Sequence, residues 1–267
     1  MRWSRFPVAG LALSLLAIGA PLRAQQPEPA ARDSGLTITP AFEGWYRNPD
    51  GTYSLSFGYY NRNRQETLDI PIGPNNRMEP GGPDLGQPTH FQARRHWGAF
   101  AVNVPANFGD RKIVWTLIAR GDTVAIPGSL DPLWQIDALE GEAGSNNTPP
   151  VLRFDAAGAE ARGPGGITAG PRTAKVGEPL TLDAWVTDEA SPPRLTVTWI
   201  KHRGPGSVQF GDATPDIGED GKSTTTAMFS EPGDHVLRLR ANDGAVAGAG
   251  HAQCCWTNAF LRITVTR

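Results

Sequence analysis

The chain is 267 residues long and carries 31 glycines, 24 prolines and two cysteines, with a formal net charge of −2. Glycine and proline at this density interrupt helices and separate short strands, so the composition favours an all-β chain rich in turns. A nearly neutral chain without a run of Lys or Arg lacks a basic surface for nucleic acid, and no nucleic-acid partner is expected. Two cysteines are too few for a disulfide scaffold, so stability must come from hydrophobic cores.

The N-terminus has the three parts of a secretory signal peptide. Residues 1–5 carry two arginines and no acidic side chain, residues 6–20 are apolar except for one serine, and residues 21–24 end on an alanine suited to cleavage. The apolar run is shorter than the ~20 residues that a membrane-spanning helix needs, and no later segment is apolar enough to span a bilayer. The sequence predicts a signal peptide over residues 1–24 and a spacer over residues 25–34. The chain is then expected to be exported, to the periplasm, the outer surface or the extracellular medium.

Residues 35–140 show the period-two alternation of half-buried strands. One run places large side chains opposite small or polar ones: Tyr53, Leu55, Phe57 and Tyr59 against Ser54, Ser56 and Gly58. A second run, residues 112–120, alternates in the same way, and Gly121 and Asp122 after it predict a tight hairpin. This sequence shows no helical stripe, so the segment is predicted to be an antiparallel β-sandwich of unknown function.

A Gly-, Ala- and Pro-rich stretch over residues 141–169 is predicted to be a flexible linker, since its composition cannot bury enough apolar surface to order itself. Residues 151–154 (Val-Leu-Arg-Phe) interrupt this composition. Alternating strands resume in residues 170–267, where about seven short strands within roughly 100 residues have the size and spacing of an immunoglobulin-type sandwich. The predicted fold class is therefore all-β, with two antiparallel β-sandwich domains.

The second predicted domain also resembles a known family. Residues 197–200 (VTWI) are followed by residues 204–210 (GPGSVQF), and residues 227–244 read AMFSEPGDHVLRLRANDG. These strings resemble parts of the PKD-like immunoglobulin modules of exported and surface proteins. The resemblance implies that Trp199 fills the core from the third strand and that the Pro-Gly pair turns the chain, while His235 stands where an aromatic residue is usual. It implies a fold more than a function, because such modules commonly serve as spacers, present other parts of a protein or bind ligands.

The first predicted domain resembles a group of uncharacterised exported bacterial proteins in residues 81–91 (GGPDLGQPTHF) and 94–98 (RRHWG), a likeness that implies no activity. This stretch is predicted to be the distinctive contact surface of the chain. Its histidines and arginines suit an anion or a metal, but a regular strand would separate the two histidines by about 20 Å. Solvated polar side chains beside a half-buried strand are the alternative. The candidate binding residues are His90, Arg94, Arg95, His96 and Trp97.

Cys254 and Cys255 are adjacent and precede the last predicted strand. An exported chain meets oxidising conditions, so a vicinal disulfide is one interpretation of this pair. A copper or zinc site of Cys254, Cys255 and His251 is another, because thiolates with imidazole suit soft metals, although no fourth ligand is evident. Buried thiols and bonds to another chain are the remaining alternatives. No other cofactor is expected.

Other patterns predict little chemistry. Residues 216–221 (DIGEDG) begin like a calcium loop but lack the later ligands, so they predict an acidic turn and no calcium site. The sequence has no nucleophile elbow, zinc-binding helix, phosphate loop or dinucleotide fingerprint, so no enzyme is predicted, with a hydrolase site built from loops as the alternative. Aromatic residues of the first domain would suit a sugar or peptide if exposed, and the core if not. They include Tyr46, Tyr53, Tyr59, Tyr60, Trp97, Trp115 and Trp134.

Together these features predict an exported, non-catalytic binding, adhesion or structural protein of the bacterial cell envelope. The expected partner is another exported protein or a surface glycan. The alternative function is that of a metal-handling or redox protein centred on Cys254 and Cys255 with His251.

Overall fold

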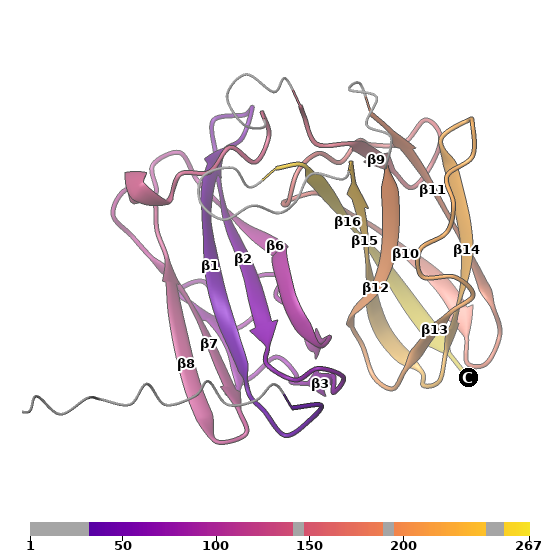
Figure 1. Ribbon diagram of the computed structural model, residues 1–267, viewed down its shortest axis with the longest axis horizontal. Coiled ribbons are helices and arrows are strands. Elements are labelled where there is room, and N and C mark those ends of the chain that lie inside the picture. Colours follow the sequence, from indigo (N-terminus) through magenta and orange to yellow (C-terminus); the bar gives the residue numbers. More distant parts are fainter. Residues whose placement is uncertain (1–31, 141–146, 189–194, 244–253) are drawn as a thin grey trace, which may run out of the picture. The chain divides into compact units, whose positions relative to one another are not determined.

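The computed structural model describes residues 32–140, 147–188, 195–243 and 254–267, which form two β-sandwiches and their connections (Figure 1). Contacts separate residues 1–30 from residues 31–267, and the second of these units contains both sandwiches. The regular structure of its described residues consists of strands and one 3-10 turn, η1 (Pro132–Trp134). Among the described residues, no helix has the length and apolarity needed to span a bilayer. The predicted all-β fold class is confirmed.

The first sandwich lies in residues 38–128, and its named strands pair antiparallel. One sheet has the order β1-β2-β6, a second has the order β4-β7-β8, and β3 pairs with β5. The strands are β1 (Ile38–Arg47), β2 (Tyr53–Asn61), β3 (Leu68–Asp69), β4 (Asn76–Glu79), β5 (His90–Phe91), β6 (Arg94–Val104), β7 (Ile113–Ala119) and β8 (Asp122–Gly128).

The core of the first sandwich is built from the large side chains that the alternation predicts. Phe57 and Tyr59 of β2 are buried in one cluster with Trp115 of β7, and the rings of Phe57 and Trp115 meet edge-on with 6.2 Å between centroids. Between β7 and β8, Arg120 and Gly121 have φ values of 54° and 85°. Two successive positive φ values are typical of a two-residue type I′ hairpin turn. The predicted hairpin is therefore present, with its turn one residue earlier than expected.

The second sandwich has the strand order of an immunoglobulin domain. Its sheets have the orders β13-β14-β11-β9 and β10-β16-β15-β12. Strands β11 to β16 correspond to strands B to G of that fold, and β9 and β10 correspond to two parts of its strand A. Read from β9 to β13, the first sheet is A-B-E-D. Read from β12 to β16, the second sheet is C-F-G, and β10 extends it at the edge next to β16. Strand β10 pairs parallel with β16. The strands are β9 (Val151–Arg153), β10 (Ile167–Lys175), β11 (Leu180–Thr187), β12 (Thr196–Arg203), β13 (Val208–Phe210), β14 (Lys222–Phe229), β15 (Gly233–Asn242) and β16 (Trp256–Thr266).

Two residues that the family resemblance singles out have clear structural roles. Trp199 of β12 is buried in the core, with its ring centroid 6.0 Å from that of Phe154. His235, near the start of β15, donates a hydrogen bond from Nε2 to the carbonyl oxygen of Glu231 at 3.2 Å. A tyrosine hydroxyl makes the corresponding bond to upstream backbone in immunoglobulin domains. The histidine therefore takes over the corner contact that an aromatic hydroxyl usually makes.

The described part of the predicted linker, residues 147–169, belongs to the second sandwich. It contains β9 and the start of β10, and Leu152 and Ala161 exchange two backbone hydrogen bonds of 3.1 and 2.8 Å. The prediction fails here because Val151, Leu152 and Phe154 bury their side chains, which offsets the entropy cost of ordering the glycines around them. Residues 32 and 33 of the predicted spacer likewise accept backbone hydrogen bonds from residues 64–66.

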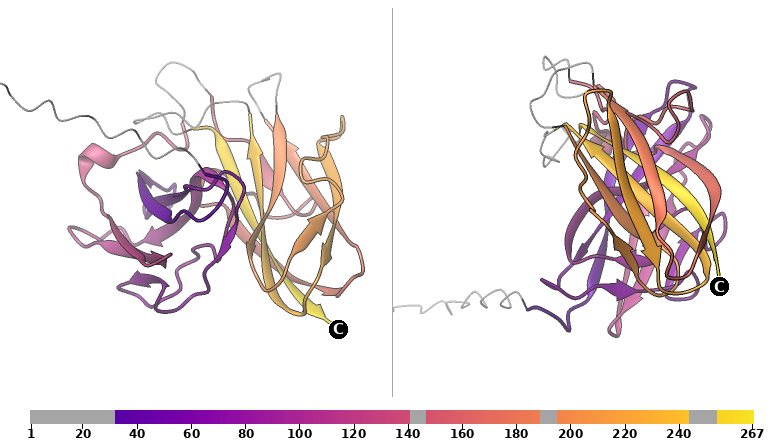
Figure 2. Two further views of the ribbon diagram at one scale, coloured as in Figure 1. Left: turned by 60° about the horizontal axis from the view of Figure 1, so that its bottom comes forward. Right: turned by 90° about the vertical axis from the view of Figure 1, so that its right-hand side faces the viewer.

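The sheet β1-β2-β6 is buried on both faces. Ser54 and Ser56 lie opposite the core side chains of β2, yet they are only 1% and 0% exposed. Strands β15 and β16 of the second sandwich lie against this sheet (Figure 2), and Phe260 of β16 joins the core cluster of the first sandwich. The alternation predicts a half-buried strand, whereas the small side chains on its second face make room for a neighbouring sheet.

Candidate functional site

The contact between the two sandwiches, here called the junction, contains a buried arginine. Arg238 of β15 is 1% exposed and donates from Nη1 to the carbonyl oxygen of Ala99 on β6 at 2.8 Å. Its Nε has no hydrogen-bond partner among the described residues. Burial lowers the pKa of Arg238 to about 10, because the charged guanidinium has lost its water. Arg238 thus joins the sheets with one directed bond at a considerable desolvation cost.

A second contact of the junction is made by the start of β16. Asn258 donates from Nδ2 to the carbonyl oxygens of Gly98 at 2.7 Å and Pro164 at 2.8 Å. Trp256 lies so close to Gly98 that a Cβ on that glycine would be 2.5 Å from Cζ2 of the indole. The φ of Gly98 is +44°, a conformation that favours glycine. The close approach of β6 and β16 therefore depends on the missing side chain at position 98.

Arg95 and Trp97, two of the predicted binding residues, are engaged within the protein. Arg95 Nη2 lies 2.6 Å from Oε1 of the buried Glu43, and the Arg95 guanidinium stacks over Trp97 with 3.8 Å to the ring centroid. Burial raises the pKa of Glu43 to about 7, although the neighbouring Arg95 charge acts in the opposite direction. Glu43 and Arg95 therefore form an ion pair with a buried carboxylate and a partly exposed guanidinium that stacks on Trp97.

His96 and Arg94 occupy very different surroundings. His96 stacks on Tyr59 with 4.8 Å between ring centroids, and its Nε2 donates to the carbonyl oxygen of Ala93 at 3.1 Å. Burial, followed by the nearby Arg238 charge, lowers the pKa of His96 to about 3, so the ring is neutral at physiological pH. Arg94 is exposed, with a positive φ of 75° at the start of β6.

His90 is held by a separate group of charges. Its Nδ1 lies 2.8 Å from Oδ1 of Asp69, the residue that faces it across the β3–β5 pair. The same carboxylate oxygen lies 3.4 Å from Nζ of Lys201 on β12. Burial acts to raise the pKa of Asp69, but its interactions with His90 and Lys201 outweigh burial and lower that pKa. The structure therefore gives His90 and His96 different partners and does not assemble the five predicted residues into one binding site.

The predicted contact surface, residues 81–97, is in large part an internal contact. Arg203 of β12 makes a bidentate ion pair with Asp84, with bonds of 2.9 and 2.7 Å, and donates from Nε to the carbonyl oxygen of Gln87 at 2.7 Å. His202 bonds the carbonyl oxygen of Gly86 at 2.9 Å and accepts a backbone bond from Thr89 at 3.0 Å. Residues 84–89 of this loop therefore bind the edge of β12 in the second sandwich through their backbone groups and the Asp84 carboxylate.

Sequence reasoning missed the residues that define the junction. Arg238 alternates with apolar residues in β15, a pattern that predicts a polar, solvated face, and Asn258 belongs to no recognisable pattern. Glu43, whose partner Arg95 lies in the same sandwich, did offer a sequence signal, since it is the one charged residue of the run 38–46. A lone carboxylate in a largely apolar strand predicts an internal partner, because an unpaired buried charge is costly.

Cys254 and Cys255 are joined to each other by a disulfide. Both are buried, and Cys255 Sγ lies 3.6 Å from the carbonyl oxygen of Asn147. In this form neither sulfur is the thiolate that a metal ligand requires. His251, the third member of the predicted copper or zinc site, lies outside the described residues. The metal alternative stays a prediction.

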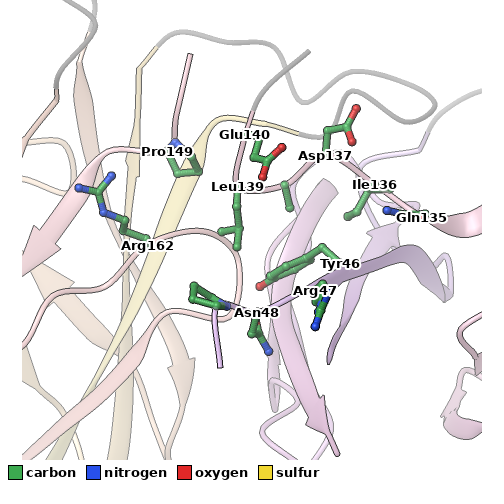
Figure 3. Close-up of a pocket in the computed structure, with 12 residues that line it drawn as sticks. Tyr46, Arg47, Asn48, Gln135, Ile136, Asp137, Leu139, Glu140, Pro149 and Arg162 are labelled. Carbon is green, nitrogen blue, oxygen red and sulfur yellow. The ribbon is translucent and has the colours of Figure 1, made fainter. Parts of the chain in front are cut away.

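Several clefts open on the surface of the described residues, and two of them involve residues of the first sandwich. The larger of these two, of about 780 Å³, is lined by residues 46–49, residues 135–140, Pro149 and Arg162. In Figure 3 the carboxylates of Asp137 and Glu140 lie on one side of it, with Arg162 and Arg47 on others. This mixed lining favours neither anions nor cations. The smaller cleft, of about 460 Å³, lies beside Trp134.

Comparisons with known proteins give no family. No protein-family model matches the chain, and no curated protein matches it. Among solved structures, the D00-D0 domain of intimin is 15% identical with a TM-score of 0.27, and the match covers 86% of this chain and 100% of that one. Domains 4 and 5 of the S-layer protein SbsC are 11% identical with a TM-score of 0.27, covering 59% of this chain and 66% of that one.

A third similar structure is a nucleoside hydrolase-related hypothetical protein from Saccharophagus degradans that is associated with carbohydrate metabolism. It is 16% identical with a TM-score of 0.31, and the match covers 45% of this chain. This chain therefore spans about a quarter of that protein, 26% of its length. At these TM-scores the likenesses carry no argument about function.

Proposed function

We propose that this chain is an exported, non-catalytic binding protein of the bacterial cell envelope. The observation that carries the proposal is the junction, where the buried Arg238 of β15 is bonded to the backbone of β6. Within the first sandwich, the buried Glu43 of β1 is likewise paired with Arg95 of β6. A substrate cannot reach groups that are buried in this way. We therefore attribute their shifted pKa values to burial within the fold and not to a catalytic role.

The junction also supports a role in presenting surfaces. It fixes the orientation of two sandwiches through buried contacts, in contrast to domains on a flexible tether. Binding sites on such folds are carried by loops and clefts outside the core, and the sequence of those loops sets their ligand. A protein of this design can hold two or more surfaces at a constant spacing for adhesion or assembly.

Export is the second part of the proposal. The predicted signal peptide supports it, and so does the disulfide between Cys254 and Cys255, since disulfides persist mainly in oxidising compartments outside the cytoplasm. The PKD-like character of the second sandwich belongs to the proposal as well, supported by the buried Trp199 and by the corner contact of His235. PKD-like modules are typical of exported and surface proteins.

The test is to express the full chain with its own signal peptide in an export-competent bacterium and to separate cytoplasm, envelope and medium. We expect an exported protein whose intact mass places the N-terminus at Gln25. The purified exported protein is then mixed with washed envelope fragments of the source bacterium and sedimented, and we expect it in the pellet. An uncleaved chain in the cytoplasm contradicts export, and a protein that stays in the supernatant contradicts envelope binding.

A panel of glycan and ester substrates tests the non-catalytic part. We expect no turnover above the buffer rate, and clear turnover of any substrate would overturn that part of the proposal.

A further inference from the structure

Trp134 is a large aromatic side chain that the fold leaves open to solvent. It is 50% exposed, at the end of η1, and its neighbour Leu133 is 81% exposed. Most other aromatic residues of the first sandwich are buried in its core. A half-exposed indole beside a cleft is a feature that marks binding sites, because its apolar face is available for contact while its N–H can still bond.

The turn that carries Trp134 is held in place by several hydrogen bonds. Asp131 caps it, accepting from the Leu133 amide at Oδ1 (2.9 Å) and from the Trp134 amide at its carbonyl oxygen (2.9 Å). The indole N–H of Trp45 donates to the same carbonyl oxygen at 2.7 Å, and Ile136 donates to the Trp45 carbonyl oxygen at 2.9 Å. The ring of Trp134 is therefore presented by a preorganised segment, which lowers the entropy cost of binding.

The cleft beside the ring, of about 460 Å³, is lined by both apolar and polar residues. Trp134 and Phe42, whose ring centroids are 5.6 Å apart, line it together with other residues of β1 and β8. Its polar lining residues include Lys112, Ser129 and Asp131, which carry an ammonium, a hydroxyl and a carboxylate. Its volume is in the range of pockets that accept small ligands or single units of a polymer.

A pyranose ring matches this lining. One face of the sugar carries C–H groups, which pack against the negative face of an indole, while its edge carries hydroxyls that both donate and accept hydrogen bonds. A peptide added as a strand fits less well. Pro40 of β1 and Pro127 of β8 both line the cleft, and proline supplies no N–H for strand pairing.

We infer that Trp134 and the cleft beside it form a binding site for a pyranose unit of an envelope or extracellular polysaccharide. The inference rests on the proposed function and names its ligand class. Trp134 stacks on the sugar ring, and Lys112, Ser129 and Asp131 contact its hydroxyls.

The experiment uses the exported protein on an array of defined oligosaccharides: chitin, cellulose, xylan and mannan fragments and peptidoglycan muropeptides. Affinity for the best glycan is then measured by calorimetry for the wild type and four variants. We expect Trp134→Ala to weaken binding at least tenfold, equivalent to about 1.4 kcal/mol. Trp134→Phe should keep affinity within about fivefold, because a flat aromatic face remains. Lys112→Ala, which changes an exposed side chain, should weaken binding a fewfold.

Leu133→Ala is the matched control, since Leu133 is apolar, adjacent and more exposed but offers no aromatic face. It should leave affinity unchanged. The inference is overturned if no glycan on the array binds, or if Trp134→Ala binds as tightly as the wild type. Sedimentation with envelope fragments separates the two proposals: envelope binding that survives Trp134→Ala removes the sugar site and leaves the proposed function standing.

Discussion

Arg238 of β15 donates a 2.8 Å hydrogen bond to the carbonyl oxygen of Ala99 on β6 and so connects the two sandwiches through a side chain with almost no contact to solvent. No carboxylate pairs with this guanidinium within the described residues, and the lowered pKa reflects that cost. A cation buried without an acidic partner is tolerated only where the surrounding contacts are strong. Those contacts come from the close approach of β6 and β16 around Gly98, Trp256 and Asn258.

Gly98→Ala tests the close approach at the junction. The added Cβ would meet the Trp256 indole at 2.5 Å, so we expect a loss of stability of about 2–4 kcal/mol from overpacking and from the positive φ together. Gly109→Ala is the control, because Gly109 also has a positive φ (61°) but a Cβ there would have no described atom within 4 Å. It should cost about 1–2 kcal/mol. Urea denaturation measures both, and equal losses would show that Trp256 does not restrict position 98.

The Glu43–Arg95 pair predicts a pH dependence with a definite sign. In the folded chain the pKa of Glu43 is about 7, against the ordinary value of 4.5 that we assign to the unfolded chain. Between these values the folded chain holds a proton that the unfolded chain has released, so stability is greatest below pH 4.5 and is lost as the pH rises towards 7. The slope is at most about 1.4 kcal/mol per pH unit for one proton.

The measurement is the free energy of unfolding of the wild type minus that of Glu43→Gln at each pH. Taking this difference cancels the contribution of His96, whose lowered pKa acts in the opposite direction across an overlapping pH range. We expect the difference to fall from about pH 4.5 to 7 and to be flat above about pH 8. A difference that rises with pH over this window would mean that the Arg95 charge outweighs the burial of Glu43.

The disulfide predicts the mass and reactivity of the exported protein. Intact mass should be two hydrogens below that of the reduced chain, and iodoacetamide should add nothing until the protein is both unfolded and reduced, since Cys254 and Cys255 are buried. Metal analysis of the same sample should find no stoichiometric copper or zinc. One bound copper or zinc ion, together with two cysteines that iodoacetamide alkylates after chelation and unfolding without any reductant, would instead support the metal-handling alternative.

The strands can be predicted from sequence, but the packing of their second faces cannot. Alternation identifies the core side of β2 correctly, since Phe57 and Tyr59 pack with Trp115. The same alternation predicts that Ser56 faces solvent. A serine gives the same sequence pattern whether its side chain faces water or a second sheet. Only the neighbouring sheet distinguishes them, and its strands β15 and β16 come far later in the chain.

The candidate site shows the same limit. Residues 90–97 attract attention for their histidines and arginines, yet the ring of His96 stacks on Tyr59 and Arg95 pairs with Glu43, both of them from strands much earlier in the chain. A local pattern gives residue types but not long-range partners. Trp134 is one of several aromatic residues in the sequence, and only its exposure in the fold separates it from Trp115 in the core.

The proposed function requires that the junction makes the two sandwiches one folding unit. Differential scanning calorimetry of the exported protein tests this requirement most directly. We expect a single transition with equal calorimetric and van't Hoff enthalpies, which is the signature of all-or-none unfolding. Two separate transitions in the wild type, or a Gly98→Ala variant that melts like the wild type, would contradict it.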